Sequence, residues 1–151
     1  MACGGHCCDE AHPPVTKSRY DQLVAAGVPA ACFESAGYLR LRTHPDGTCI
    51  LMQDHKCTCH RVKPETCRAG PFTFDVDGNT IRIFLKHASI CPIIPLLKGE
   101  PGAYRQQYEQ AATNIANLVA HLTGEEIAEI NKIDEPDTDL VAKIPRGRGF
   151  A

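Results

Sequence analysis

The sequence predicts a single small α+β domain with short β-hairpins, a C-terminal pair of helices, a metal-ordered cysteine-rich loop and an extended C-terminal tail. Three observations predict this class. Alternating apolar and polar segments bounded by turn residues indicate strands, apolar spacings of three and four in the last third indicate helices, and a cysteine-rich stretch without a period lies between them. A length of 151 residues suits one domain, which we place at residues 1–134, with a tail at 135–151.

The first elements are a helix and a hairpin. Thr16 is a suitable N-cap for a helix that ends at Gly27. Tyr38–Arg42 alternates as a half-buried strand does, and His44–Gly47 is rich in turn residues. Thr48–Met52 is therefore expected to return as the second strand of that hairpin.

Residues 53–70 carry much charge and no apolar period, so we expect metal rather than a core to order this loop. Two strands follow, Phe72–Val76 and Thr80–Leu85, and the intervening Asp-Gly-Asn is a strong hairpin turn.

The last third is predicted to be helical and then extended. Pro101 suits the first turn of a helix that runs to about Leu122. Thr123 and Glu126 have the spacing of a capping box, which opens a short helix to about Ile133. From Glu135 the periodicity stops, and the tail is either a solvated terminus or a docking arm. Its apolar anchors would be Leu140, Val141, Ile144 and Phe150.

Composition excludes several classes of function. A net charge of −2 gives no global sign of a nucleic-acid or membrane-surface binder. The first ten residues lack the basic and apolar regions of a signal peptide, and the apolar run Ile93–Leu97 is too short to span a bilayer. We therefore expect a cytoplasmic protein with no membrane-spanning segment.

Nine cysteines are the informative part of the composition. The number is odd, and cytoplasmic thiols stay reduced, so metal binding is favoured over disulfides and over structural free thiols. They form three groups: Cys3-x3-Cys7-Cys8, Cys49-x7-Cys57-x-Cys59-x7-Cys67, and Cys91-Pro92.

The spacing of the groups favours iron–sulfur over zinc. Structural zinc sites usually show C-x2-C pairs, and this sequence has none. A thiolate-bound cluster carries negative charge, which the basic residues of the loop can offset. These are Lys56, Arg61, Lys63 and Arg68.

The combination of motifs resembles the YkgJ or CxxCxxCC cysteine-cluster family. The matching motifs are Cys3-Gly-Gly-His-Cys7-Cys8, Gly47-Thr-Cys49-Ile-Leu51, Cys57-x9-Cys67-Arg68 and Cys91-Pro92. The resemblance covers residues 3 to about 92 and implies a zinc- or iron-chelating protein, often an iron–sulfur protein. In three respects the chain departs from the family pattern. The family has a further cysteine before the position of Cys3, an aliphatic residue at Cys59, and arginine at Lys63.

Eight cysteines are the candidate metal ligands: Cys3, Cys7, Cys8, Cys49, Cys57, Cys59, Cys67 and Cys91. This number suits one or two 4Fe-4S clusters, with zinc as the alternative. Cys32 lies in an apolar context and is expected to be a small core residue. Five histidines near these groups are expected to be hydrogen-bond donors or loop residues rather than ligands. They are His6, His44, His55, His60 and His87.

The functional hypothesis is an iron–sulfur protein that acts as a redox- or oxygen-responsive accessory and binds a larger protein partner through the C-terminal tail. The alternatives are a structural zinc adaptor, and a metal-delivery factor or enzyme with an open cluster position. Catalysis is disfavoured because the sequence has no phosphate-binding loop, no nucleophile elbow and no defensible pair of carboxylates.

Overall fold

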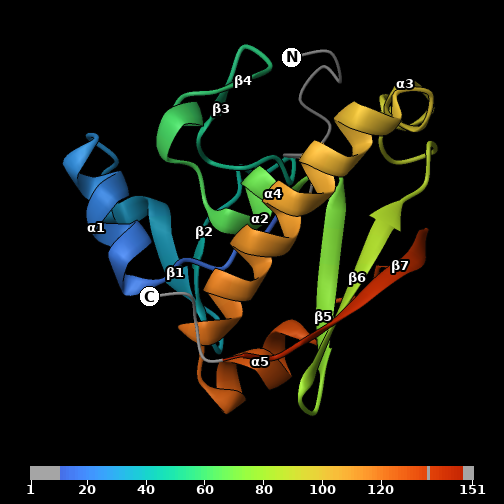
Figure 1. Ribbon diagram of the computed structural model, residues 1–151. Coiled ribbons are helices and arrows are strands. Elements are labelled where there is room, and N and C mark those ends of the chain that lie inside the picture. Colours follow the sequence, from blue (N-terminus) through green and yellow to red (C-terminus); the bar gives the residue numbers. More distant parts are fainter. Residues whose placement is uncertain (1–10, 136, 148–151) are drawn as a thin grey trace.

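A computed structural model of the protein describes residues 11–135 and 137–147. The described residues form five α-helices, two single-turn 3₁₀ helices and three small antiparallel sheets, which confirms the predicted α+β class (Figure 1). In chain order the elements are α1 (Lys17–Ala25), η2 (Ala30–Cys32), β1 (Phe33–Ser35), β2 (Leu39–Leu41), β3 (Met52–Gln53), β4 (Lys56–Cys57), η3 (His60–Val62), α2 (Glu65–Ala69), β5 (Phe72–Asp77), β6 (Thr80–Lys86), α3 (Ile94–Lys98), α4 (Pro101–Ala120), α5 (Gly124–Ile130) and β7 (Thr138–Pro145).

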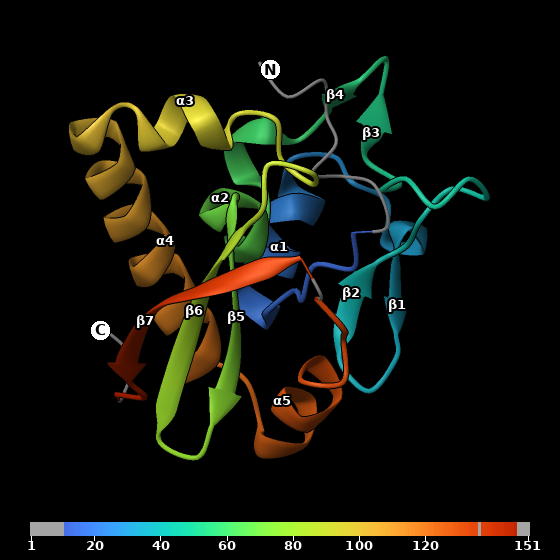
Figure 2. The ribbon, with the colours of Figure 1, turned by 90° about the vertical axis from the view of Figure 1, so that its right-hand side faces the viewer.

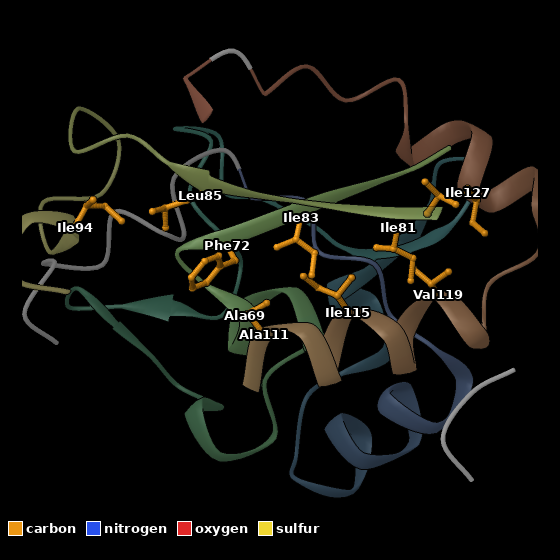
Figure 3. Close-up of a cluster of buried hydrophobic side chains, with 11 residues drawn as sticks. Ala69, Phe72, Ile81, Ile83, Leu85, Ile94, Ala111, Ile115, Val119 and Ile127 are labelled. Carbon is orange, nitrogen blue, oxygen red and sulfur yellow. The ribbon is translucent and has the colours of Figure 1, made fainter. Parts of the chain in front are cut away.

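The largest sheet has the order β5-β6-β7, and α4 packs against one of its faces (Figures 1 and 2). The predicted β5–β6 hairpin is confirmed: Asp77 pairs with Thr80, and Gly78 has the positive φ of +58° that its turn requires. Ile81 and Ile83 of β6 point toward Ile115 and Val119 of α4 (Figure 3). Side chains at alternate positions of β6 and at spacings of four residues on α4 therefore form part of the main core.

Both predicted C-terminal helices are confirmed. α4 begins at Pro101, whose lack of an N–H costs nothing in a first helical turn. α5 begins with the predicted capping box. Glu126 Oε2 accepts a hydrogen bond from the Thr123 N–H at 2.8 Å, and Thr123 Oγ1 accepts one from the Glu126 N–H at 3.2 Å.

A second core cluster lies around α1 and the β1–β2 sheet. The predicted helix is confirmed, with Thr16 as its N-cap: the Thr16 hydroxyl accepts a hydrogen bond from the Arg19 N–H at 3.2 Å. The buried members of the cluster are Val15, Leu23, Val28, Phe33, Leu41, Cys49 and Leu51. The molecule therefore has a helix-and-sheet core and a separate core that includes one predicted ligand, Cys49.

The partner predicted for strand Tyr38–Arg42 is wrong. β2 pairs with the preceding β1. The residue after β2 contacts residues 48–52 through one isolated bridge, between Thr43 and Cys49, while Met52 pairs with Cys57 in the next hairpin. The reversal between β1 and β2 uses Gly37, whose φ is +80°, and a Cβ there would lie 2.5 Å from Glu129 Cγ. Phe33–Ser35 is too short a segment for an alternation to reveal it, and this is why the sequence favoured the later partner.

The described part of the predicted tail is extended, and it packs on the domain itself. Thr138–Pro145 pairs antiparallel with β6 as the edge strand β7, with a register irregularity at Ile83 and Phe84. Ala142 and Ile144 pack against the main core, whereas Leu140 and Val141 are exposed. Ile144, one of the predicted apolar anchors, thus packs on the protein's own sheet. It can do so because β6 has an edge with which a further strand can pair. Phe150 lies outside the described residues.

Candidate metal centre

Three of the predicted ligands, which come from different local elements, line one cavity. Cys49, Cys57 and Cys67 all lie on the wall of a cavity of about 550 Å³. In Figure 1 the β3–β4 hairpin, which carries Cys57, lies above α2, which carries Cys67. Ala11, the first described residue, also lines the cavity.

Local backbone chemistry places Cys49 and Cys57. Cys49 follows a turn in which Asp46 Oδ1 accepts hydrogen bonds from the Thr48 N–H at 2.9 Å and the Thr48 hydroxyl at 2.7 Å. These hydrogen bonds, first of all that from the backbone N–H, lower the pKa of Asp46. Cys57 pairs with Met52 across the β3–β4 hairpin.

The turn of the β3–β4 hairpin escaped the sequence prediction. Its two central residues, Asp54 and His55, have φ values of +49° and +60°. Both are in the left-handed region, as a two-residue type I′ hairpin requires, but neither is glycine. Aspartate and histidine tolerate this region better than most residues, so the Asp54-His55 pair was the feature of the sequence from which this turn could have been predicted.

α2 holds Cys67 and is anchored by a buried ion pair. Arg19 Nε and Nη2 donate hydrogen bonds to Glu65 Oε1 at 3.2 and 2.9 Å, and the two side chains are only 11% and 5% exposed. Gln107 of α4 donates to the carbonyl of Gly70 at 2.6 Å. The loop expected to depend on metal alone is thus also held by α1 on one side and α4 on the other.

The basic residues of the loop divide into different roles. The Arg68 guanidinium donates to the carbonyls of Lys63 and Arg61, at 3.1 and 2.8 Å, so it braces the loop. Lys63 lines the cavity, as does Lys86 from β6. Lys63 and Lys86 are therefore the described cations best placed to offset thiolate charge there.

The remaining predicted ligands lie elsewhere. Cys59 packs against the second core cluster and Cys91 against the main core, and neither is among the cavity-lining residues. Cys32, predicted as a packing residue, is partly buried against the second cluster. Cys3, Cys7 and Cys8 lie outside the described residues.

The described residues do not make a metal site by themselves. Across residues 11–135 and 137–147, no group of three or more His, Cys, Asp or Glu side chains is close enough to hold an ion. The donor types at the cavity nevertheless fit zinc or iron, because thiolates bind both metals. Any complete site must take further donors from the N-terminal cysteines or bring the described ones closer together.

Sequence reasoning missed one nitrogen donor. His12 lines the cavity, and its Nδ1 is buried without a hydrogen-bond partner. The available signal was its position, four residues after Cys8 and directly before Pro13-Pro14. His60 also lines the cavity but is exposed.

Three other histidines near the cysteine groups, His44, His55 and His87, do not line the cavity. His44 Nε2 lies 3.3 Å from the Met52 carbonyl, and His87 Nε2 lies 2.9 Å from Asp139 Oδ1. His55 occupies the β3–β4 turn, and His6 lies outside the described residues.

Comparison with known proteins identifies the N-terminal part of the chain. Residues 1–92 match the CxxCxxCC family, which is described as a "putative zinc- or iron-chelating domain". Searches of curated proteins and of solved structures found no match. No helix among the described residues is long and apolar enough to cross a membrane.

Proposed function

The chain belongs to the CxxCxxCC domain family, and from this premise we propose that it holds an iron–sulfur cluster and acts as a redox- or oxygen-responsive accessory to a larger protein. The cluster would be bound by thiolates of the cavity together with cysteines of the N-terminal segment. The protein's role would be to change its surface when the cluster changes state, rather than to turn over a substrate.

One observation carries the proposal: Cys49, Cys57 and Cys67 line the same cavity, which Ala11 also lines. Cys7 and Cys8 precede Ala11 by only four and three residues in the sequence, so we include them with these thiols in the proposed ligand set. Thiolates from these N-terminal cysteines would supply the ligands that are missing among the described residues.

The accessibility of the cavity suits a redox-active cluster. Cys57 and Cys67 are half-buried, so a group bound there would lie within reach of oxygen and of redox partners.

Metal analysis after anaerobic purification tests the proposal. We expect a brown protein in which iron and acid-labile sulfide are present in equal amounts. Zinc without sulfide would replace the proposal with the structural adaptor. A cluster with only three cysteine ligands would instead favour the metal-delivery factor or enzyme. Absence of both metals from protein loaded anaerobically would overturn metal binding altogether.

The partner would dock on the exposed part of β7. β7 is an edge strand of the sheet, and Leu140 and Val141 are 48% and 39% exposed. Leu140→Lys and Val141→Lys should weaken partner capture from native lysate, and capture by the unmodified protein should differ between anaerobic and air-exposed samples. Val24→Lys, at an exposed apolar residue of α1, is the control. Equal capture by all these proteins would remove the docking role, and capture indifferent to oxygen would remove the sensing role.

A further inference from the structure

The backbone of His12 and of the residues that follow it is held by contacts with β2 and with Tyr38. The buried Tyr38 donates a hydrogen bond from its hydroxyl to the His12 carbonyl at 3.3 Å. Two residues later Pro14 forms a bridge with Arg40, and the Val15 N–H donates to the Leu39 carbonyl at 2.8 Å. His12 is therefore attached to β2 and cannot move far without breaking these contacts.

His12 lines the cavity, and one nitrogen of its imidazole ring has no hydrogen-bond partner. This nitrogen, Nδ1, is buried, although buried polar atoms are ordinarily hydrogen-bonded. Each of His44, His87 and His121 has a ring nitrogen at hydrogen-bonding distance from a protein oxygen. His12 alone among these four combines a buried, unsatisfied ring nitrogen with a place on the wall that Cys49, Cys57 and Cys67 share.

We propose that His12 is a ligand of the metal centre and binds the metal through Nδ1. This inference rests on the proposed metal-binding function of the cavity and extends the donor set beyond cysteine. Imidazole binds both zinc and iron, as in Cys₃His zinc sites and in iron–sulfur centres in which histidine replaces cysteine. Coordination would give Nδ1 the partner that it lacks in the protein.

A mixed donor set would also change the charge of the site. A neutral imidazole in place of a thiolate makes the ligand shell one unit less negative, which lowers the need for nearby cations. Lys63 and Lys86 are the described lysines that line the cavity, and Asp75 from β5 and Glu135 also line it. A less negative centre suits a wall on which cations and carboxylates are mixed.

The test combines isotope labelling with matched variants. The full-length protein is purified anaerobically with ¹⁵N-labelled histidine, and pulsed EPR is recorded on the reduced cluster, or on Co²⁺ exchanged into the site if the native metal is zinc. The variants are His12→Asn, which keeps a polar atom near the Nδ1 position, and His12→Cys, which supplies a thiolate. His60→Asn is the control, because His60 lines the same cavity but is exposed.

We expect strong ¹⁵N coupling in the unmodified protein and in His60→Asn, and none in His12→Asn. Metal affinity should fall at least about tenfold in His12→Asn, and His12→Cys should restore the metal content with an altered spectrum. Circular dichroism checks that each variant is folded, so that loss of metal through unfolding is recognised.

The outcomes separate this inference from the function on which it rests. A protein that holds iron or zinc but shows no histidine nitrogen coupling, or keeps that coupling in His12→Asn, overturns the role of His12 and leaves the proposed function standing. A protein that binds neither metal under any loading condition overturns both.

Discussion

At the scale of single residues, two ion pairs of α1 differ sharply in their exposure to solvent. The pair Arg19–Glu65 is almost fully buried, whereas the pair Lys17–Asp21, on the same helix, is 81% and 59% exposed. Burial makes removal of one partner costly, because the remaining charge is left in a medium of low dielectric. An exposed pair contributes little, because water solvates and salt screens both charges.

Arg19→Ala should therefore destabilise the protein by about 3 kcal/mol, since Glu65 would remain as an uncompensated buried charge. Urea unfolding of the metal-loaded protein measures this change. Lys17→Ala is the control and should change the unfolding free energy by less than about 0.5 kcal/mol. The double variant Arg19→Leu/Glu65→Leu should recover most of the loss, and a double variant as unstable as Arg19→Ala would contradict the explanation.

The cysteines should also differ from one another at this scale. Cys67→Ser should abolish or convert the metal centre, because the serine hydroxyl is a harder and poorer donor than a thiolate. Cys32→Ser should leave the metal content unchanged and lower only the melting temperature, because Cys32 packs against the second core cluster and does not line the cavity. Iron and zinc analysis of both purified variants decides this. Loss of metal from Cys32→Ser, with retention in Cys67→Ser, would reverse the assignment.

At the scale of elements, β7 is attached to the sheet by its ladder, by Ala142 and Ile144, and by one side-chain link. That link joins Asp139 Oδ1 to His87 Nε2 at 2.9 Å. The hydrogen bond with His87 is the main reason that the pKa of Asp139 lies below its ordinary value, and the charges of His87 and Lys98 act in the same direction.

The direction of this pKa shift predicts a pH dependence. A carboxylate with a lowered pKa stabilises the fold above its unfolded pKa of about 3.9, and this stabilisation is lost as the pH falls through the lower folded pKa. Asp139→Asn should therefore melt below the unmodified protein at pH 6, and the gap should close below about pH 4. Thermal melts of both proteins at each pH measure the gap. A gap that stays constant down to pH 2 would show that ionisation of Asp139 is not its cause.

At the scale of the whole molecule, the two hydrophobic cores depend differently on metal. The main core is closed by α4 and the sheet, and in it Phe72 makes edge-to-face contacts with Tyr104 and Tyr108 at 5.6 and 5.8 Å. The second core includes Cys49 and receives Cys57 and Cys59 at its margin. Ligation at the cavity would stabilise this second core more than the first, because metal binding adds its free energy where the ligands lie.

Metal removal should consequently loosen the second core first. We expect chelation or oxidative loss of the cluster to expose residues 48–63 to protease while residues 101–120 remain protected, since no residue of α4 lines the cavity and α4 packs in the main core. Limited proteolysis followed by mass spectrometry maps the cuts. A colourless, metal-free protein with unchanged protease resistance and an unchanged melting curve would contradict metal-dependent ordering.

The sequence by itself determined the elements that are stabilised locally. α1, α4, α5 and the β5–β6 hairpin were predictable because their caps, turn residues and apolar periods lie within the element itself. The grouping of the cysteines likewise sufficed to predict the family, and comparison with known proteins confirmed it.

Only the tertiary structure decided the pairings between distant segments. β1 rather than Thr48–Met52 pairs with β2, β7 joins the sheet from the far end of the chain, and Cys49, Cys57 and Cys67 share a wall with His12. The physical reason is that a strand edge accepts any segment of suitable length, so hydrogen bonding alone does not select the partner. The three-dimensional packing of the two cores makes that selection, and the place of His12 at the cavity follows from it.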